Sequence, residues 1–144
     1  MRSLRKKTHF DKDSRVIFAG TVYENTLVNR IREGATAYIH GHEVGGTNPS
    51  LLEGLASSDI CILMDVPFNR EVGENAALYF TKASGSLRDA MLKVEKMFPT
   101  KRSSYATNAQ KRIMEAYHCS DISRKYEELF EGLDQSMRSM IRRD

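Results

Sequence analysis

Short apolar runs alternate with segments of helical pattern along the first half of the chain. The apolar runs are rich in β-branched and aromatic residues, which is typical of buried strands. Between them, apolar residues recur at helical spacing or follow helix-start residues. The predicted strands are Arg15–Gly20, Ala35–His40, Asp59–Asp65 and Ala77–Phe80, the predicted helices are Glu24–Gly34 and Pro49–Ser58, and Val66–Ala76 is predicted to be a loop with a short helix.

The second half of the chain is predicted to be helical. Apolar residues recur at helical spacing in three segments, 87–98, 105–113 and 122–140. Pro99 ends the first segment, and Asp121 is placed to cap the last helix. The apolar stripe of that last helix indicates either core contact or a docking face. If the chain self-associates, this Met-rich helix is the expected surface.

The alternation of strands and helices predicts an α/β fold with one parallel sheet and helices on both of its faces. Residues 1–14 are polar and basic and are interpreted as a lead-in, while residues 15–144 have the size of a single domain. In parallel sheets of this kind, ligands bind outside the carboxyl ends of the strands. The loops that follow the second and third predicted strands should therefore lie at the ligand-binding edge.

Composition narrows the class of protein. The chain has 144 residues, of which 40% are hydrophobic, so it can bury a core. Its formal net charge of +3 is too mild to indicate nucleic acid, and its basic residues are not interleaved with aromatic ones. Cys61 and Cys119 lie far apart and form no disulfide framework, which fits a reducing cytosol. No apolar run has the ~20 residues of a membrane span, so a cytoplasmic protein is expected, with attachment at the inner face of the cell membrane left open.

The stretch "HGHEVGGTNPSLLEGLA", residues 40–56, combines the most restrictive residues of the chain. Adjacent Gly45 and Gly46 suggest backbone that approaches a ligand closely or takes a positive φ. Asn48 can cap the following helix, with Pro49 in its first turn. Ser50 and Leu51 would then offer free backbone N–H groups, and the positive end of the helix favours a phosphate.

Two charged side chains near this loop are candidates for ligand contacts. Glu53 lies about one turn further along the helix and could accept hydrogen bonds from sugar hydroxyls. Arg70 follows the third strand and could place positive charge near a phosphate. The competing interpretation is a tight turn and a surface helix, with Glu53 in solvent and Arg70 paired with a nearby carboxylate.

His40 and His42 are not expected to form a metal site. A catalytic zinc site usually has three protein ligands, and no third ligand has suitable spacing in the sequence. A structural or ligand-contacting role is the better interpretation of this pair. No metal and no cofactor are therefore predicted.

The loop and the segment "DVPFNREVGENAALYF", residues 65–80, together resemble the nucleotide-sugar-binding half of family-four retaining glycosyltransferases, which have two Rossmann-like domains (the GT-B fold). The chain is most similar to the bacterial polysaccharide subgroup that includes rhamnosyltransferases, where "HGH-x-VGGTNPSLLE" and "FNREV" recur. The resemblance extends from about Val16 to "YHCSDISRKYEELF", residues 117–130. It implies a Rossmann-like domain that binds a UDP-, GDP- or dTDP-sugar, with a saccharide or lipid-linked acceptor and no metal.

The resemblance also implies roles for individual residues. The amides of the helix start would contact the donor diphosphate, the backbone of Gly45 and Gly46 would approach the donor sugar, and Glu53 would hold the ribose. Glu53 matches the second Glu of the family's Glu-x7-Glu motif, but Gly45 stands where the first Glu should be, and Glu43 lies two residues too early. Glu43 is the candidate to replace that carboxylate. The implied helix-start residues are Asn48, Pro49, Ser50 and Leu51, and the matching residues of the next loop are Phe68, Asn69, Arg70 and Glu71.

Two parts of the family pattern are missing from this sequence. The family's Gly-Arg…Lys segment, which neutralises the donor diphosphate, is not found, and neither is the acceptor-binding domain. The expectation is therefore a partial donor-binding domain, either a trimmed chain or a short reading frame, that needs its missing half or a partner chain. The alternative is a non-catalytic nucleotide- or phosphate-binding module that acts with a partner chain.

Overall fold

The structure, a computed structural model, describes the backbone of residues 8–141 and their side chains except at positions 119 and 134–141. Its centre is a three-stranded sheet in which all strands are parallel and the order is β1-β2-β3. Tyr38 pairs with Cys61, which pairs in turn with Ala77. The predicted α/β class and the parallel sheet are confirmed. The strands are β1 (Tyr38–His40), β2 (Cys61–Met64) and β3 (Ala77–Phe80).

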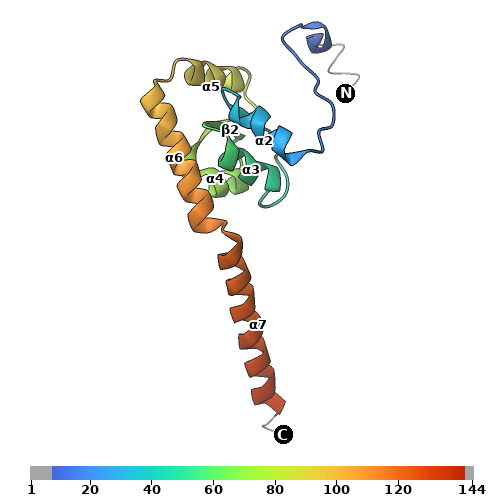
Figure 1. Cartoon of the computed structure of the whole chain (residues 1–144), viewed down its shortest axis with the longest axis vertical. Helices are drawn as coiled ribbons and strands as arrows, with labels where there is room; N and C mark the ends of the chain where they lie inside the picture. Colours follow the sequence, from blue (N-terminus) through green and yellow to red (C-terminus); the bar gives the residue numbers. More distant parts are fainter. Residues whose placement is uncertain (1–7, 142–144) are drawn as a thin grey trace.

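Helices cover both faces of the sheet (Figure 1). On one face, β2 packs against α3 (Pro49–Ser57), α4 (Pro67–Gly73) and α6 (Pro99–Ala116). On the other face it packs against α5 (Ser86–Glu95). The strand residues alternate between the two layers because successive side chains of a strand point to opposite faces. The first core cluster includes Leu51, Leu55, Cys61, Leu63, Val72 and Ala109, and the second includes Ile60, Ile62, Met64, Leu78, Phe80 and Val94.

The local helix signals account for most of the helix boundaries. Pro67 and Pro99 each open a helix, where the missing proline N–H costs nothing. The short helix expected after the third strand is α4, which continues into η2 (Glu74–Ala76). The helix α2 (Asn25–Glu33) matches its prediction closely, and its neighbour in space is α3. A single turn, η1 (Phe10–Lys12), lies near the start of the described chain.

The predicted strand Arg15–Gly20 is wrong. These residues form no helix or strand, and their apolar side chains are exposed, with Ile17 86% accessible and Phe18 60% accessible. The physical reason is that a strand needs a neighbour to satisfy its backbone groups. The described sheet ends at β1, and no backbone hydrogen bond joins residues 15–20 to it. Figure 1 shows this segment leaving the body of the molecule ahead of α2.

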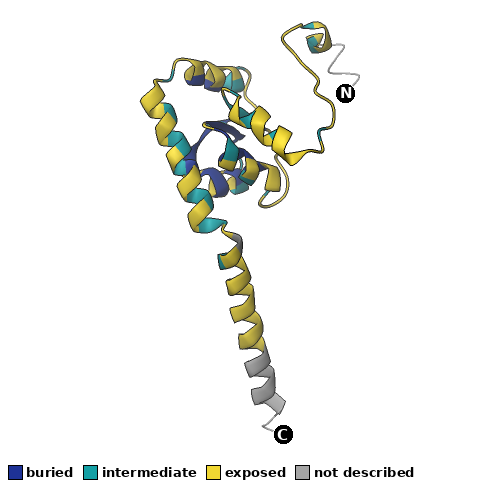
Figure 2. Ribbon diagram, viewed as in Figure 1, coloured by how far each residue is buried: buried dark blue, intermediate teal, exposed yellow. Residues whose placement is uncertain are grey.

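The last helix, α7 (Cys119–Ile141), extends away from the sheet and its covering helices (Figure 1). It begins two residues before Asp121, so the predicted cap at Asp121 is wrong and this carboxylate lies in the first turn. The apolar stripe is exposed over the described part of the helix, as Figure 2 shows. Core contact within this chain therefore does not explain the stripe from Ile122 to Leu133, while Met137 and Met140 lie outside the residues whose side chains the structure describes. Its exposed members are Ile122, Tyr126, Leu129, Phe130 and Leu133.

Candidate functional site

The loops after the three strands meet at the carboxyl edge of the sheet. Glu43, in the loop after β1, forms an ion pair of 2.5 Å with Lys82, in the loop after β3. Between them, Asn69 on α4 donates from Nδ2 to the carbonyl oxygen of His42 at 3.0 Å and to that of Met64 at 2.9 Å. The predicted position of the glycine loop at this edge is therefore confirmed.

The glycine loop between β1 and α3 takes a positive φ at one of its two adjacent glycines. Gly45 has φ +119°, a conformation that side chains rarely allow, whereas Gly46 does not take a positive φ. Both glycines face open space, with no atom within 4 Å of a Cβ built on them. Within the described chain, the amides of Gly45, Gly46 and Thr47 donate no hydrogen bond. Three adjacent exposed backbone donors are therefore available at the edge of the sheet.

The start of α3 is capped as predicted, and this changes which amides are available. Asn48 Oδ1 accepts from the Ser50 amide at 2.9 Å, with Pro49 in the first turn. The Leu51 amide donates to the Asn48 carbonyl oxygen at 2.9 Å. The expectation that Ser50 and Leu51 offer free N–H groups is therefore wrong, because the cap that forms the helix start uses them. The free donors lie one to three residues before the cap residue Asn48, in the loop, beside the positive end of α3.

Glu53 lies on the second turn of α3 but is not free. Its Oε2 atom accepts from Arg32 Nη1 on α2 at 3.0 Å. The Arg32 side chain is only 13% exposed and also lies over the Tyr38 ring, whereas Glu53 is 56% exposed. One carboxylate oxygen is therefore held by α2. Arg32 was not identified from the sequence, because no pattern links α2 to α3 before the two helices are seen in contact.

Arg70 forms a local ion pair rather than an open phosphate site. Its guanidinium donates to both carboxylate oxygens of Asp65, one of them at 2.7 Å from Nη2, and lies 4.5 Å from the centre of the Tyr79 ring. The hydrogen bond from Arg70 holds the pKa of Asp65 below its usual value. This geometry matches the interpretation of Arg70 as one member of a surface ion pair. To contact a phosphate, the Arg70 guanidinium would have to give up part of its contact with Asp65.

Two buried polar side chains at this edge each carry one atom without a hydrogen-bond partner in the described structure. His40 is 3% exposed and Asn69 is fully buried, and the atoms are His40 Nε2 and Asn69 Oδ1. His40 Nδ1 lies 3.2 Å from the Tyr38 hydroxyl, and its ring stacks on His42 with 5.2 Å between centroids. Burial, and then the charge of His42, lower the pKa of His40. Such groups are normally satisfied, so they indicate a place for water or a ligand polar group.

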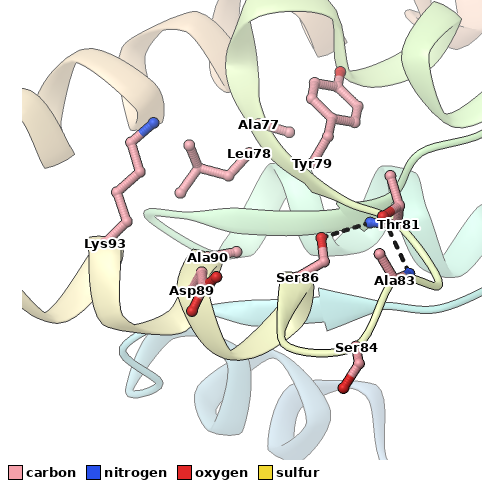
Figure 3. Close-up of a pocket in the computed structure, with 10 residues that line it drawn as sticks. All are labelled: Ala77, Leu78, Tyr79, Thr81, Ala83, Ser84, Ser86, Asp89, Ala90 and Lys93. Atoms are coloured by element: carbon pink, nitrogen blue, oxygen red, sulfur yellow. Dashed lines mark hydrogen bonds between the residues drawn. The ribbon is translucent and has the colours of Figure 1, made fainter.

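A separate cavity lies beside β3 (Figure 3). It has a volume of about 620 Å³, and Lys93 and Asp89 of α5 border it. Ser86 Oγ accepts from the Thr81 amide at 2.9 Å, and both residues line the cavity. None of the residues predicted to bind a ligand borders this cavity. In the described part of the chain, no group of three or more His, Cys, Asp or Glu side chains could hold a metal ion.

No helix within the described residues is long and apolar enough to cross a membrane. Comparisons of the chain with protein-family models, with curated proteins and with solved structures found no match.

Proposed function

We propose that the carboxyl edge of the sheet binds the diphosphate of a nucleotide sugar, and that the chain is the donor-binding part of a glycosyltransferase with a partial Rossmann-like domain. The observation that carries this proposal is the group of free amides at Gly45, Gly46 and Thr47. Backbone N–H groups beside a helix N-terminus stabilise an anion without requiring a side chain of opposite charge. The sequence resemblance supplies the class of substrate.

The side chains around the loop fit the other parts of such a donor. Glu53 would hold the ribose hydroxyls through Oε1, the oxygen that does not accept from Arg32. Lys82 approaches the same loop through its ion pair with Glu43. Glu43 would contact the donor sugar, in place of the carboxylate that the family pattern has two residues later. Binding would require Glu43 to exchange Lys82 for the sugar, which is a small cost for an exposed ion pair.

The acceptor of the transferred sugar would be a bacterial polysaccharide or a lipid-linked saccharide, as in the enzymes that the sequence resembles. A second candidate function is non-catalytic binding of a nucleotide or phosphate in a complex with another chain. The ion pairs of Glu53 and Arg70 favour this candidate, because they leave the backbone donors as the principal contacts. Transfer of radiolabelled sugar to an oligosaccharide or lipid-linked acceptor distinguishes the two candidates.

A charge placed in the loop tests the proposal directly. Gly46 faces open space at a φ that side chains allow, so Gly46→Asp and Gly46→Asn should both fold. The two variants have nearly the same size and differ in charge. We expect calorimetry with UDP-, GDP- and dTDP-sugars to show binding by the parent and by Gly46→Asn, and about tenfold or greater weakening in Gly46→Asp. Equal affinity in both variants would contradict a phosphate at this loop.

A further inference from the structure

The outer side of β1 carries no strand in the described structure. β1 pairs only with β2, so its outward backbone groups face no neighbouring strand. Ile39 on β1 is 41% exposed, whereas its register partner Ile62 on β2 is fully buried. An open edge with an exposed apolar side chain is a template for adding another strand.

A shallow apolar hollow runs beside this edge on the α5 face. It has a volume of about 220 Å³, and Ile39, Ile62 and Val94 are among the apolar residues that line it. Glu95 also lines it, as does Thr36, which precedes β1. Glu95 forms no ion pair with another described residue. The hollow therefore offers an apolar surface with one unpaired carboxylate near the start of β1.

The position of α2 indicates where a further strand would lie. The helix α3 connects β1 to β2, and α4 connects β2 to β3. Both helices lie on the same face of the sheet. Strand–helix–strand crossovers are right-handed, so a strand that precedes α2 would lie outside β1, under a helix beside α3. The helix α2 does lie beside α3, and its apolar residues Leu27 and Ile31 are 43% and 52% exposed. No described strand lies beyond β1 under α2.

The chain itself carries a segment suited to this place. Residues 15–20, "RVIFAG", have the composition of a buried strand but lie exposed ahead of α2. We call residues 15–20 the arm. Figure 1 shows the arm directed away from the sheet of its own molecule. Each molecule therefore has one open edge and one strand-like arm, which is the condition for a reciprocal, two-fold exchange between two copies.

Charge complementarity fixes the orientation. If the arm adds parallel to β1, its first residue, Arg15, comes to the start of β1, where Glu95 borders the hollow. In the single chain, the exposed Arg15 pairs with the partly exposed Asp13, a contact that contributes little. We propose that the arm of a second copy adds to the outer edge of β1, so that two chains form a dimer by exchanging their arms. The arm then covers Ile39 and lies under α2.

The first test is the mass of the particle in solution. Analytical ultracentrifugation should give a dimer, twice the chain mass of 16.4 kDa. Ile17→Asp should raise the dissociation constant about tenfold or more, because burial of an Ile side chain contributes ~1.5–3 kcal/mol. Ile17 is 86% exposed in the single chain, so this change should leave the fold intact. The matched control is Leu129→Asp on the exposed stripe of α7, which should leave the dimer unchanged.

The second test locates the arm. Two single variants, Ile17→Cys and Thr36→Cys, are each made in a Cys119→Ser background, mixed, and treated with a short bismaleimide. The native Cys61 is buried and should not react. Cross-linked pairs that contain one chain of each variant are expected. Arg15→Glu and Glu95→Arg should each weaken the dimer, and the double exchange should restore it. A monomeric parent, cross-links confined to single chains, or a dimer lost on Leu129→Asp but kept on Ile17→Asp would overturn the proposal.

Discussion

Asn69 donates a hydrogen bond of 3.0 Å to the carbonyl oxygen of His42 and thereby ties the glycine loop to the end of β2. The Asn69 side chain is fully buried, so this contact holds the loop from the protein interior. The solvent-facing side of the loop stays open. An amide is the appropriate group here, because two carbonyl oxygens converge on its two N–H donors. The contact explains how an exposed loop of small residues can hold its amides in one arrangement.

Asn69→Leu should lower the free energy of unfolding by about 1–3 kcal/mol. The change keeps the branched shape of the side chain but removes its two N–H donors, so the carbonyl oxygen of His42 loses its donor and that of Met64 keeps only the Val66 amide. Urea denaturation followed by circular dichroism measures the loss. Asn75→Leu is the control, since Asn75 is exposed and its side chain forms no hydrogen bond within the described chain. Equal effects of the two changes would show that the contact does not hold the loop.

Glu53→Gln should weaken nucleotide binding about tenfold or more, because a hydrogen bond to a charged group contributes ~1.5–3 kcal/mol. The ion pair with Arg32 supplies the control, since Arg32→Gln breaks the same pair but keeps the carboxylate. Only Glu53→Gln should lose affinity in calorimetric titration. If Arg32→Gln loses as much affinity, Glu53 acts through the ion pair rather than through the ribose.

The fold should lose stability as the pH falls below the usual His pKa near 6.5. Burial lowers the pKa of His40, so the unfolded chain takes up this proton at a higher pH than the folded chain does. Between the two pKa values stability therefore rises with pH, and the contribution is complete above the unfolded value. The measurement is the unfolding free energy against pH for the parent and for His40→Gln. A difference between the two curves that does not change between pH 5 and 7 would contradict this assignment.

Gly54→Ala should destabilise the fold by about 1–3 kcal/mol through overpacking. A Cβ at Gly54 would lie 2.4 Å from the Tyr38 ring, and that ring is held between α3 and Arg32. Gly132 on α7 is the matched control, because a Cβ there meets nothing within 4 Å and alanine favours the helix. Thermal unfolding should show a lower midpoint for Gly54→Ala alone. An unchanged midpoint would mean that Tyr38 moves aside freely.

Local patterns were sufficient to predict most elements of the fold. The apolar runs before His40, Asp65 and Thr81 are strands, and the Asn48 cap forms as predicted. Arg15–Gly20 has the same local pattern and is not a strand, because pairing depends on a neighbour that the pattern does not contain. The sequence of a segment therefore indicates its strand propensity, whereas a strand forms only where a neighbouring strand is available to pair with it.

The candidate site was predicted in its location but not in its contacts. The glycine loop, Glu53 and Arg70 were identified from residue types and from the resemblance, and the loop lies at the expected edge. The partners Arg32 and Lys82 come from distant elements, so no local spacing could indicate them, whereas Asp65 is the nearby carboxylate of the surface-pair interpretation of Arg70. The Ser50 and Leu51 amides were expected to be free but are not. The reason is that the helix cap at Asn48 satisfies the same amides that a ligand would need.

The central claim is that the glycine loop binds the diphosphate of a nucleotide sugar through its backbone. The most direct measurement is a ¹H–¹⁵N NMR titration of the chain with UDP-, GDP- and dTDP-sugars. The account predicts saturable shifts of the Gly45, Gly46 and Thr47 amides with at least one donor, and little change for residues around the cavity beside β3. Shifts confined to Thr81, Ser86 and Lys93 at that cavity, or no shift with any donor, would contradict it.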